Sequence, residues 1–140
     1  MRLVLDTSVM VAAIRSNAGA SNRLLAAGLA RRLALLVSTP LLIEYEAVMT
    51  RAEHLEASGL AADEVEAMLD AITAVAEPVR LAFLWRPALR DPDDDMVLET
   101  AANGRADAIV TFNLGDFAGV AQKHGVQTLT PGQAWKRIGP

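Results

Sequence analysis

The chain has 140 residues, 52% hydrophobic and 21% charged, a balance that supports a folded core and excludes a disordered chain. Its formal net charge is −4 and it has no cysteine, which excludes disulfides, thiolate metal sites and cysteine nucleophiles and fits a reducing compartment. No apolar run approaches the roughly 20 residues that cross a bilayer, and Asp6 comes too early for a signal peptide. We therefore expect one cytoplasmic domain spanning residues 1–140.

Short β-rich runs alternate with longer helical ones in the first half of the chain. Residues 2–5 predict a buried strand, and helices are expected at 8–15 and 21–30, on either side of the breaker Asn17-Ala18-Gly19. Another strand is expected at 33–37. Thr39-Pro40 then predicts a helix with a hydroxyl N-cap and proline at its first position. Five apolar residues of that helix share one arc, as in an amphipathic helix: Leu41, Leu42, Tyr45, Val48 and Met49.

The second half continues the alternation. A polar stretch at 53–59 leads to a long helix at 61–76, and residues 79–83 predict a third strand. A helix is expected after Asp91-Pro92-Asp93, strands at 108–111 and 125–129, and a short helix from Pro131. Alternating strands and helices of this length predict a three-layer α/β/α sandwich around a mainly parallel five-stranded sheet.

Several acids and an amide fall where such a sheet places its ligand sites, beyond the carboxyl ends of the strands. Asp6 ends the first expected strand, Asn113 and Asp116 follow the fourth, and the run 93–95 opens the helix before it. These groups converge if the first and fourth strands are neighbours. Each also has a structural explanation: Asp6 as a helix cap, the run as charges favoured by a helix dipole, and Asp116 as a loop acid that starts the next helix.

Two glutamates flank the apolar arc of the third expected helix. Glu44 lies on one side of the arc and Glu46 on the other. A helical wheel does not choose between them, and a solvated helix face explains both.

The negative net charge bears on nucleic-acid binding, because affinity for phosphates normally comes from Lys and Arg. Clustered carboxylates offer another route, since they hold divalent cations that then meet the phosphate. The sequence therefore allows a nucleic-acid enzyme only if its acids gather around metal ions.

Four segments together resemble the PIN-domain family, and in particular the VapC-like toxins of bacterial toxin–antitoxin systems. The segments 1–10, MRLVLDTSVM, and 39–45, TPLLIEY, are similar to the family's opening strand and third helix. The run 91–95, DPDDD, is similar to a stretch in a subgroup of such toxins, and 111–117, TFNLGDF, to the turn after the fourth strand. The resemblance spans nearly the whole chain.

The resemblance implies a set of metal-binding carboxylates. Asp6 matches the first and Glu44 the second, and Asp95 matches the third, with Asp94 or Asp93 as alternatives. Asn113 stands where many members carry Asp, a departure that puts the second metal position in doubt, and Asp116 in the following turn is taken as the fourth carboxylate. The implied catalytic and metal-binding residues are therefore Asp6, Glu44, Asp95 and Asp116. Four residues would support the shell: Ser8, Thr111, Asn113 and Asp94.

The implied activity is that of an endoribonuclease that hydrolyses RNA phosphodiester bonds with Mg²⁺ or Mn²⁺, as two ions per site about 4 Å apart. Arg15, Arg23 and Arg51 are candidates for gripping the substrate backbone. His54 and His124 lie outside the matched motifs and are expected at the surface.

The implied partners are an RNA substrate, a small cognate antitoxin and a second copy of the chain as a homodimer. The main alternative is a PIN-like scaffold that binds RNA or protein without cutting. A receiver-like phosphoacceptor domain fits less well, because Asp6 stands alone and Lys123 precedes a strand rather than ending one. No G-x-G-x-x-G follows the first strand and no P-loop is present, which excludes a typical dehydrogenase or P-loop enzyme.

Overall fold

The computed structural model describes residues 1–83 and 92–139, with Pro92 and Asp93 as backbone alone. Its sheet has five strands in the order β3-β2-β1-β4-β5, and every pair of neighbours is parallel. The strands are β1 Arg2–Leu5, β2 Ala34–Val37, β3 Glu77–Pro78, β4 Ala108–Val110 and β5 Gln127–Leu129. The predicted α/β fold is confirmed, and the sheet is parallel throughout.

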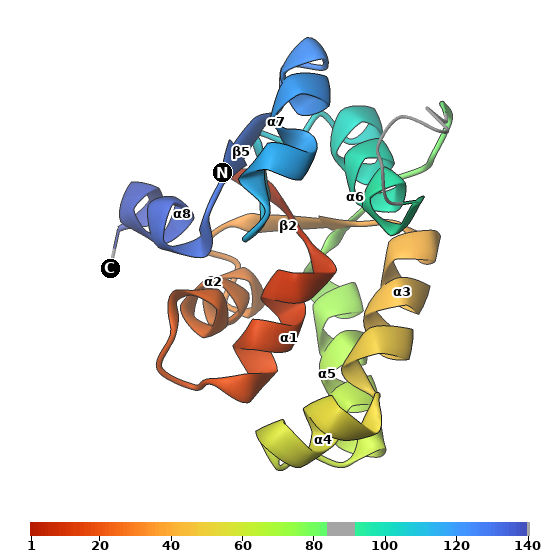
Figure 1. Cartoon of the computed structure of the whole chain (residues 1–140), viewed down its shortest axis with the longest axis vertical. Coiled ribbons are helices and arrows are strands. Elements are labelled where there is room, and N and C mark those ends of the chain that lie inside the picture. Colours follow the sequence, from red (N-terminus) through yellow and green to blue (C-terminus); the bar gives the residue numbers. More distant parts are fainter. Residues whose placement is uncertain (84–91, 140) are drawn as a thin grey trace.

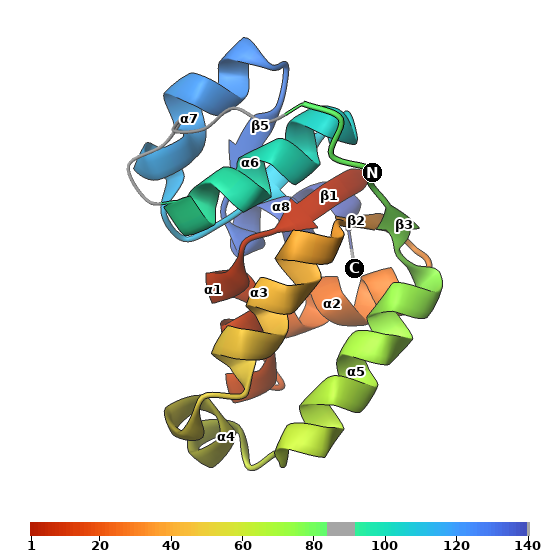
Figure 2. The same ribbon diagram turned by 90° about the vertical axis from the view of Figure 1, so that its right-hand side faces the viewer.

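Helices cover both faces of the sheet (Figures 1 and 2). Their bounds are α1 Thr7–Arg15, α2 Ala20–Leu29, α3 Thr39–Met49, α4 Ala52–Ser58, α5 Ala62–Val75, α6 Pro92–Asn103, α7 Leu114–Lys123 and α8 Pro131–Ile138. In chain order, β2 and β3 are added on one side of β1, and β4 and β5 are then added on its other side. Right-handed crossovers therefore put α6 and α7 on the face opposite α1, α2 and α5. No helix within residues 1–83 and 92–139 is long and apolar enough to span a membrane.

The two central strands are buried on both faces, which explains their nearly continuous apolar sequences. All six side chains of the paired core are at most 2% exposed: Leu3, Val4, Leu5, Ala108, Ile109 and Val110. Leu5 is in register with Val110, and the backbone N–H of Asp6 donates to the carbonyl oxygen of Val110 at 2.9 Å. Asp6 and Thr111 therefore leave the sheet side by side, at the point where strand order reverses.

The predicted strand at 79–83 is wrong. The strand is the two-residue β3, Glu77–Pro78, and pairing with β2 ends where the Val79 N–H donates to the Val37 carbonyl at 2.7 Å. The Ala82 N–H then donates to the Arg80 carbonyl, so the chain turns away from the sheet. Pro78 has no N–H to donate, and a proline belongs at an edge such as this one.

Two local predictions around α3 also need correction. The N-cap is Ser38 rather than Thr39: the Ser38 hydroxyl accepts from the Leu41 N–H at 3.4 Å and contacts the Thr100 hydroxyl at 2.7 Å. The polar stretch at 53–59 is mostly helical, as α4, and it ends at Gly59 with φ 75°. Glycine suits this left-handed position because it has no Cβ to clash.

Candidate functional site

The site begins with Asp6, a carboxylate that is 5% exposed at the end of β1. Asp6 occupies the N-cap position of α1, but its side chain makes no hydrogen bond that would cap the helix there. It instead accepts from the Thr111 hydroxyl at 2.7 Å and the Ser8 hydroxyl at 3.1 Å, both on Oδ2. Two neighbouring elements thus fix the orientation of this carboxylate.

The surroundings of Asp6 disfavour the charged form of its carboxyl group. Burial raises the pKa of the Asp6 carboxyl above its ordinary value of 3.8, and the negative charge of Asp116 raises it further. Hydrogen bonds from Thr111, Ser8 and the Thr7 backbone lower the pKa and offset part of this effect. A buried carboxylate that is held by donors and still energetically costly is typical of functional sites, where a bound cation removes the cost.

A cavity of about 350 Å³ opens beside Asp6. Ten residues line it: Asp6, Thr7, Ser8, Val11, Glu44, Val48, Arg51, His54, Asp94 and Asn113. They come from the end of β1, from α1, from α3, from α4 and its N-cap Arg51, from the start of α6 and from the turn after β4. Three carboxylates and an amide therefore face one space, with a guanidinium and an imidazole further along α3 and α4.

Glu44 reaches this space because a buried tyrosine sets the rotation of α3. The Tyr45 hydroxyl donates to the carbonyl oxygen of Leu5 at 2.5 Å, and burial chiefly, with the charge of Asp6, raises the Tyr45 pKa. The neutral hydroxyl thus anchors α3 to the last residue of β1. Glu44 lies beside that anchor and lines the cavity, whereas Glu46 is exposed and does not.

The structure separates the aspartates that the sequence left as alternatives. Asp94 lines the cavity and is half-buried, whereas Asp95 is 2% exposed and is not part of the lining. The side chain of Asp93 and the whole of Asp91 lie outside the described residues. Glu99, one turn after Asp95, is also fully buried, and no sequence pattern had marked this acid.

The remaining candidates divide by position. Asp116 is exposed and outside the lining, although its charge acts on Asp6. Thr111 is fully buried behind Asp6, and its hydroxyl also accepts from the Asn113 N–H at 3.0 Å. Of the three candidate arginines, Arg51 lines the cavity, whereas Arg15 and Arg23 are exposed elsewhere.

His54 lines the cavity, although it was predicted to lie at the surface. Its side chain is 14% exposed, and Nε2 lies 3.7 Å from a carboxylate oxygen of Glu53. The other ring nitrogen, Nδ1, is shielded from solvent and has no hydrogen-bond partner among the residues that the structure describes. No sequence motif marks His54; it reaches the cavity because α4 packs against α1.

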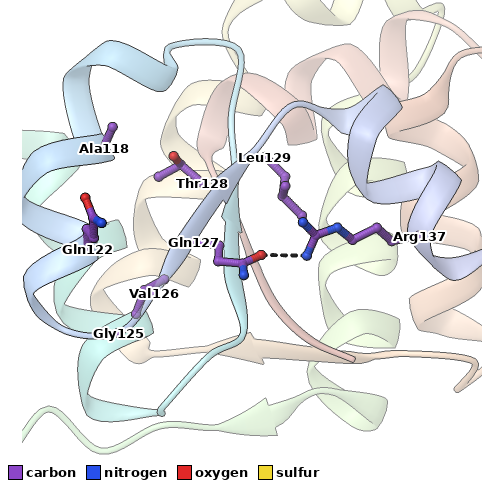
Figure 3. A pocket seen from close by; sticks show the side chains of 8 residues that line it. All are labelled: Ala118, Gln122, Gly125, Val126, Gln127, Thr128, Leu129 and Arg137. Carbon is purple, nitrogen blue, oxygen red and sulfur yellow. Dashed lines mark hydrogen bonds between the residues drawn. The ribbon is translucent and has the colours of Figure 1, made fainter.

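A larger hollow lies elsewhere, between α7, β5 and α8 (Figure 3). Its volume is about 470 Å³, and its lining holds no carboxylate. The one charged side chain there, Arg137, donates to the Gln127 side chain at 2.5 Å. The smaller cavity beside Asp6 therefore carries the chemistry that an oxygen-ligand site needs.

The donor set of that cavity fits a hard divalent cation. Carboxylate and amide oxygens are the ligands preferred by Mg²⁺ and Mn²⁺, which also retain water and need few protein ligands. In the described ranges, however, no three His, Asp or Glu side chains lie close enough together to hold one ion. Cation binding would therefore require the carboxylates of the cavity to approach one another, which their mutual repulsion opposes until a cation is present.

Comparison with known proteins agrees with this architecture. A family model described as PIN domain matches residues 2–115, which include β1, α3, α6 and β4. No curated protein matches the chain. PIN domains usually use divalent metal ions. The chain belongs to the PIN-domain family, whose members are generally nucleases.

Proposed function

We propose that this protein is a Mg²⁺- or Mn²⁺-dependent endoribonuclease that hydrolyses RNA phosphodiester bonds, and that it is the toxin of a toxin–antitoxin pair. The observation that carries the nuclease proposal is the buried Asp6 carboxylate, positioned by two hydroxyls in a cavity shared with Glu44 and Asp94. The toxin role rests on the resemblance of segments 1–10, 39–45, 91–95 and 111–117, and it implies a small antitoxin that covers the cavity.

The proposal gives roles to residues in the cavity lining and beside it. Asp6, Glu44 and Asp94 hold the cations, and Asp116 adds negative charge near Asp6. A bound divalent cation supplies charge neutralisation at the phosphate and lowers the pKa of water.

The chain's own side chains position the reacting groups. Thr111 and Ser8 keep the Asp6 carboxylate in one orientation, so that it needs no rearrangement as the reaction proceeds. Arg51, which lines the same cavity, donates to a non-bridging oxygen of the phosphodiester. The wall of three carboxylates would repel the substrate without cations, which makes activity strictly metal-dependent.

A second candidate is a PIN-like scaffold that binds RNA or protein without cutting. Two observations favour it: Asn113 replaces an acid at the cavity, and no three acidic or His side chains in the described part of the chain are already grouped around one point. The two candidates differ in whether metal produces cleavage.

The test incubates purified protein with a mixed pool of single-stranded RNA in EDTA, Mg²⁺ or Mn²⁺, with Asp6→Asn alongside. We expect fragments with either metal, none in EDTA and none from Asp6→Asn. A folded wild-type protein that binds Mn²⁺ and RNA but leaves every RNA intact would support the scaffold. Single-stranded DNA in the same assay determines whether RNA is preferred.

A cytoplasmic location and a homodimer also belong to this proposal. Sedimentation of the purified chain measures its oligomeric state, and co-purification from its native host identifies the antitoxin. A monomer at all concentrations would contradict the dimer without affecting the nuclease.

A further inference from the structure

Phe112 is an exposed aromatic residue beside the proposed active site. It is 54% exposed, although its neighbour Thr111 is fully buried. Thr111 donates to Asp6, and Asn113 lines the cavity, so Phe112 is covalently flanked by two residues of the site. An aromatic side chain this exposed contributes little to the core and leaves about half of its surface open to a ligand.

Phe112 forms one wall of a separate hollow of about 260 Å³. The rest of its lining consists of small or apolar residues from four places: Ala12 of α1 and Ser16 at its C-cap, Gly19 before α2, Ala20 and Ser21 at the start of α2, and Pro131 and Gly132 at the start of α8. The volume is slightly below the roughly 300 Å³ at which small-ligand pockets begin, which suits one planar ring system rather than a whole metabolite. No carboxylate lines this hollow.

Two short segments contribute residues both to the hollow and to the acidic cavity. In α1, Val11 lines the acidic cavity and the next residue, Ala12, lines the hollow. In the turn after β4, Asn113 lines the cavity and Phe112 the hollow. Consecutive Cα atoms are about 3.8 Å apart, so the two spaces border the same short segments.

We propose that this hollow binds an unpaired nucleobase of the substrate, stacked on the Phe112 ring, next to the phosphodiester held in the acidic cavity. This inference rests on the proposed function and specifies its substrate as single-stranded nucleic acid, because a base inside a duplex is not available to stack on a side chain. Apart from the hydroxyls of Ser16 and Ser21, the lining offers no polar side chain, so the base is held mainly by its face rather than read at its edges. Binding therefore tolerates all four bases.

The experiment measures the affinity of a fluorescently labelled single-stranded RNA oligonucleotide by anisotropy, in an Asp6→Asn background so that cleavage plays no part. Phe112→Ala is expected to raise Kd about five- to hundredfold, the usual range for losing one stacked base. Phe112→Trp retains the aromatic face and keeps the parent affinity. Because Phe112 is exposed, its loss does not unfold the protein.

Two matched variants separate stacking from general effects. Phe83→Ala removes another exposed aromatic, 67% exposed and outside this hollow, and should leave Kd unchanged. Gly132→Leu adds a side chain where a Cβ would meet nothing within 4 Å, and leucine is a better helix former than glycine. It fills the hollow and should weaken RNA binding as Phe112→Ala does, with the thermal midpoint unchanged or higher.

Replacing one nucleotide at a time by an abasic residue identifies the stacked base. At that position the abasic oligonucleotide binds equally well to the parent and to Phe112→Ala. Kd within twofold of the parent for both Phe112→Ala and Gly132→Leu would overturn the inference. The inference would also be overturned if Phe112→Ala lost as much affinity for a fully abasic strand as for the normal RNA. A Phe112→Ala variant that changed its oligomeric state but not its RNA affinity would overturn it as well. If Phe112 governs RNA binding but the wild type never cleaves, the nuclease proposal fails and the base site stands.

Discussion

Replacing Thr111 by valine tests whether its hydroxyl holds the buried carboxylate of the site. Thr111 is fully buried, and its hydroxyl donates to Asp6 at 2.7 Å and accepts from the Asn113 N–H at 3.0 Å. Valine keeps the β-branched shape and replaces only the hydroxyl with a methyl group. The change therefore removes two hydrogen bonds with little change in packing.

The expected loss follows from the nature of the acceptor. A hydrogen bond to a charged group contributes about 1.5–3 kcal/mol, and the Asn113 bond adds about 1 kcal/mol. We expect Thr111→Val to lower the free energy of unfolding by about 3 kcal/mol, or roughly 10 °C in Tm for a chain of this size. In an Asp6→Asn background the same bond joins neutral groups, so the loss should be smaller by about 1–2 kcal/mol.

Urea unfolding of the four proteins of this double-mutant cycle, in EDTA and at mildly alkaline pH, measures both numbers. A loss below about 0.5 kcal/mol, or the same loss in both backgrounds, would refute the reasoning. Either result would mean that the hydroxyl does not support the Asp6 charge. Mn²⁺ affinity is a second readout, since removing an outer partner of a ligand typically weakens metal binding about 10- to 100-fold.

Three further predictions follow from the same cavity. Asp94→Asn should lower the cleavage rate at least about tenfold with little change in stability, whereas Asp95→Asn should lower the free energy of unfolding by about 1–3 kcal/mol. Cleavage assays and urea unfolding of both variants test this, and the reverse pattern would identify Asp95 as the metal ligand. His54→Leu removes a shielded nitrogen that has no partner among the described residues, so it should raise the free energy of unfolding in urea by about 1 kcal/mol. A decrease of that size would contradict this prediction. Because the native pKa of Asp6 is raised, the native state binds more protons than the unfolded state between pH 3.8 and that pKa. The free energy of unfolding of the metal-free protein should therefore fall as pH rises through this window and stay level above it. Urea unfolding at a series of pH values measures this fall. If Asp6→Asn shows the same dependence on pH, another group is responsible for it.

The central sheet and the position of Asp6 could be predicted because they depend on local sequence. The apolar runs of β1 and β4 identify buried parallel strands, and the rule for such sheets places the site beyond their carboxyl ends. The pairing of Leu5 with Val110 then brings Asp6 and Thr111 together, as expected for neighbouring strands. The third strand was predicted at 79–83 instead of 77–78 because β3 has only two residues at the sheet edge, and its pairing depends on β2 rather than on its own sequence.

The choice between adjacent acids could not be predicted, because it depends on the rotation of each helix about its axis. Neighbouring residues differ by about 100° around a helix, so a small rotation exchanges Asp94 for Asp95. Tertiary contacts fix that angle: in α3 it is set by the hydrogen bond from Tyr45 to Leu5, which places Glu44 in the cavity. A buried tyrosine needs a partner for its hydroxyl, but the sequence does not name the partner.

His54 and Phe112 were missed for a different reason. Each lies outside the acidic pattern, and each gains its role from packing between segments that are distant in the chain. His54 reaches the cavity through the contact of α4 with α1, and Phe112 borders a hollow formed by α1, α2 and α8. Residues of this kind become visible only when the fold places them beside the carboxylates.

Mn²⁺ binding to the metal-free protein is the most direct test of the claim that the cavity beside Asp6 is a divalent-cation site. Calorimetric titration of the wild type and of Asp6→Asn, Glu44→Gln and, as an exposed control, Glu46→Gln compares the affinities. We predict that the wild type and Glu46→Gln bind Mn²⁺ alike and that the other two variants lose at least about tenfold in affinity. Equal affinity in all four proteins, or no binding by the folded wild type, would contradict the account.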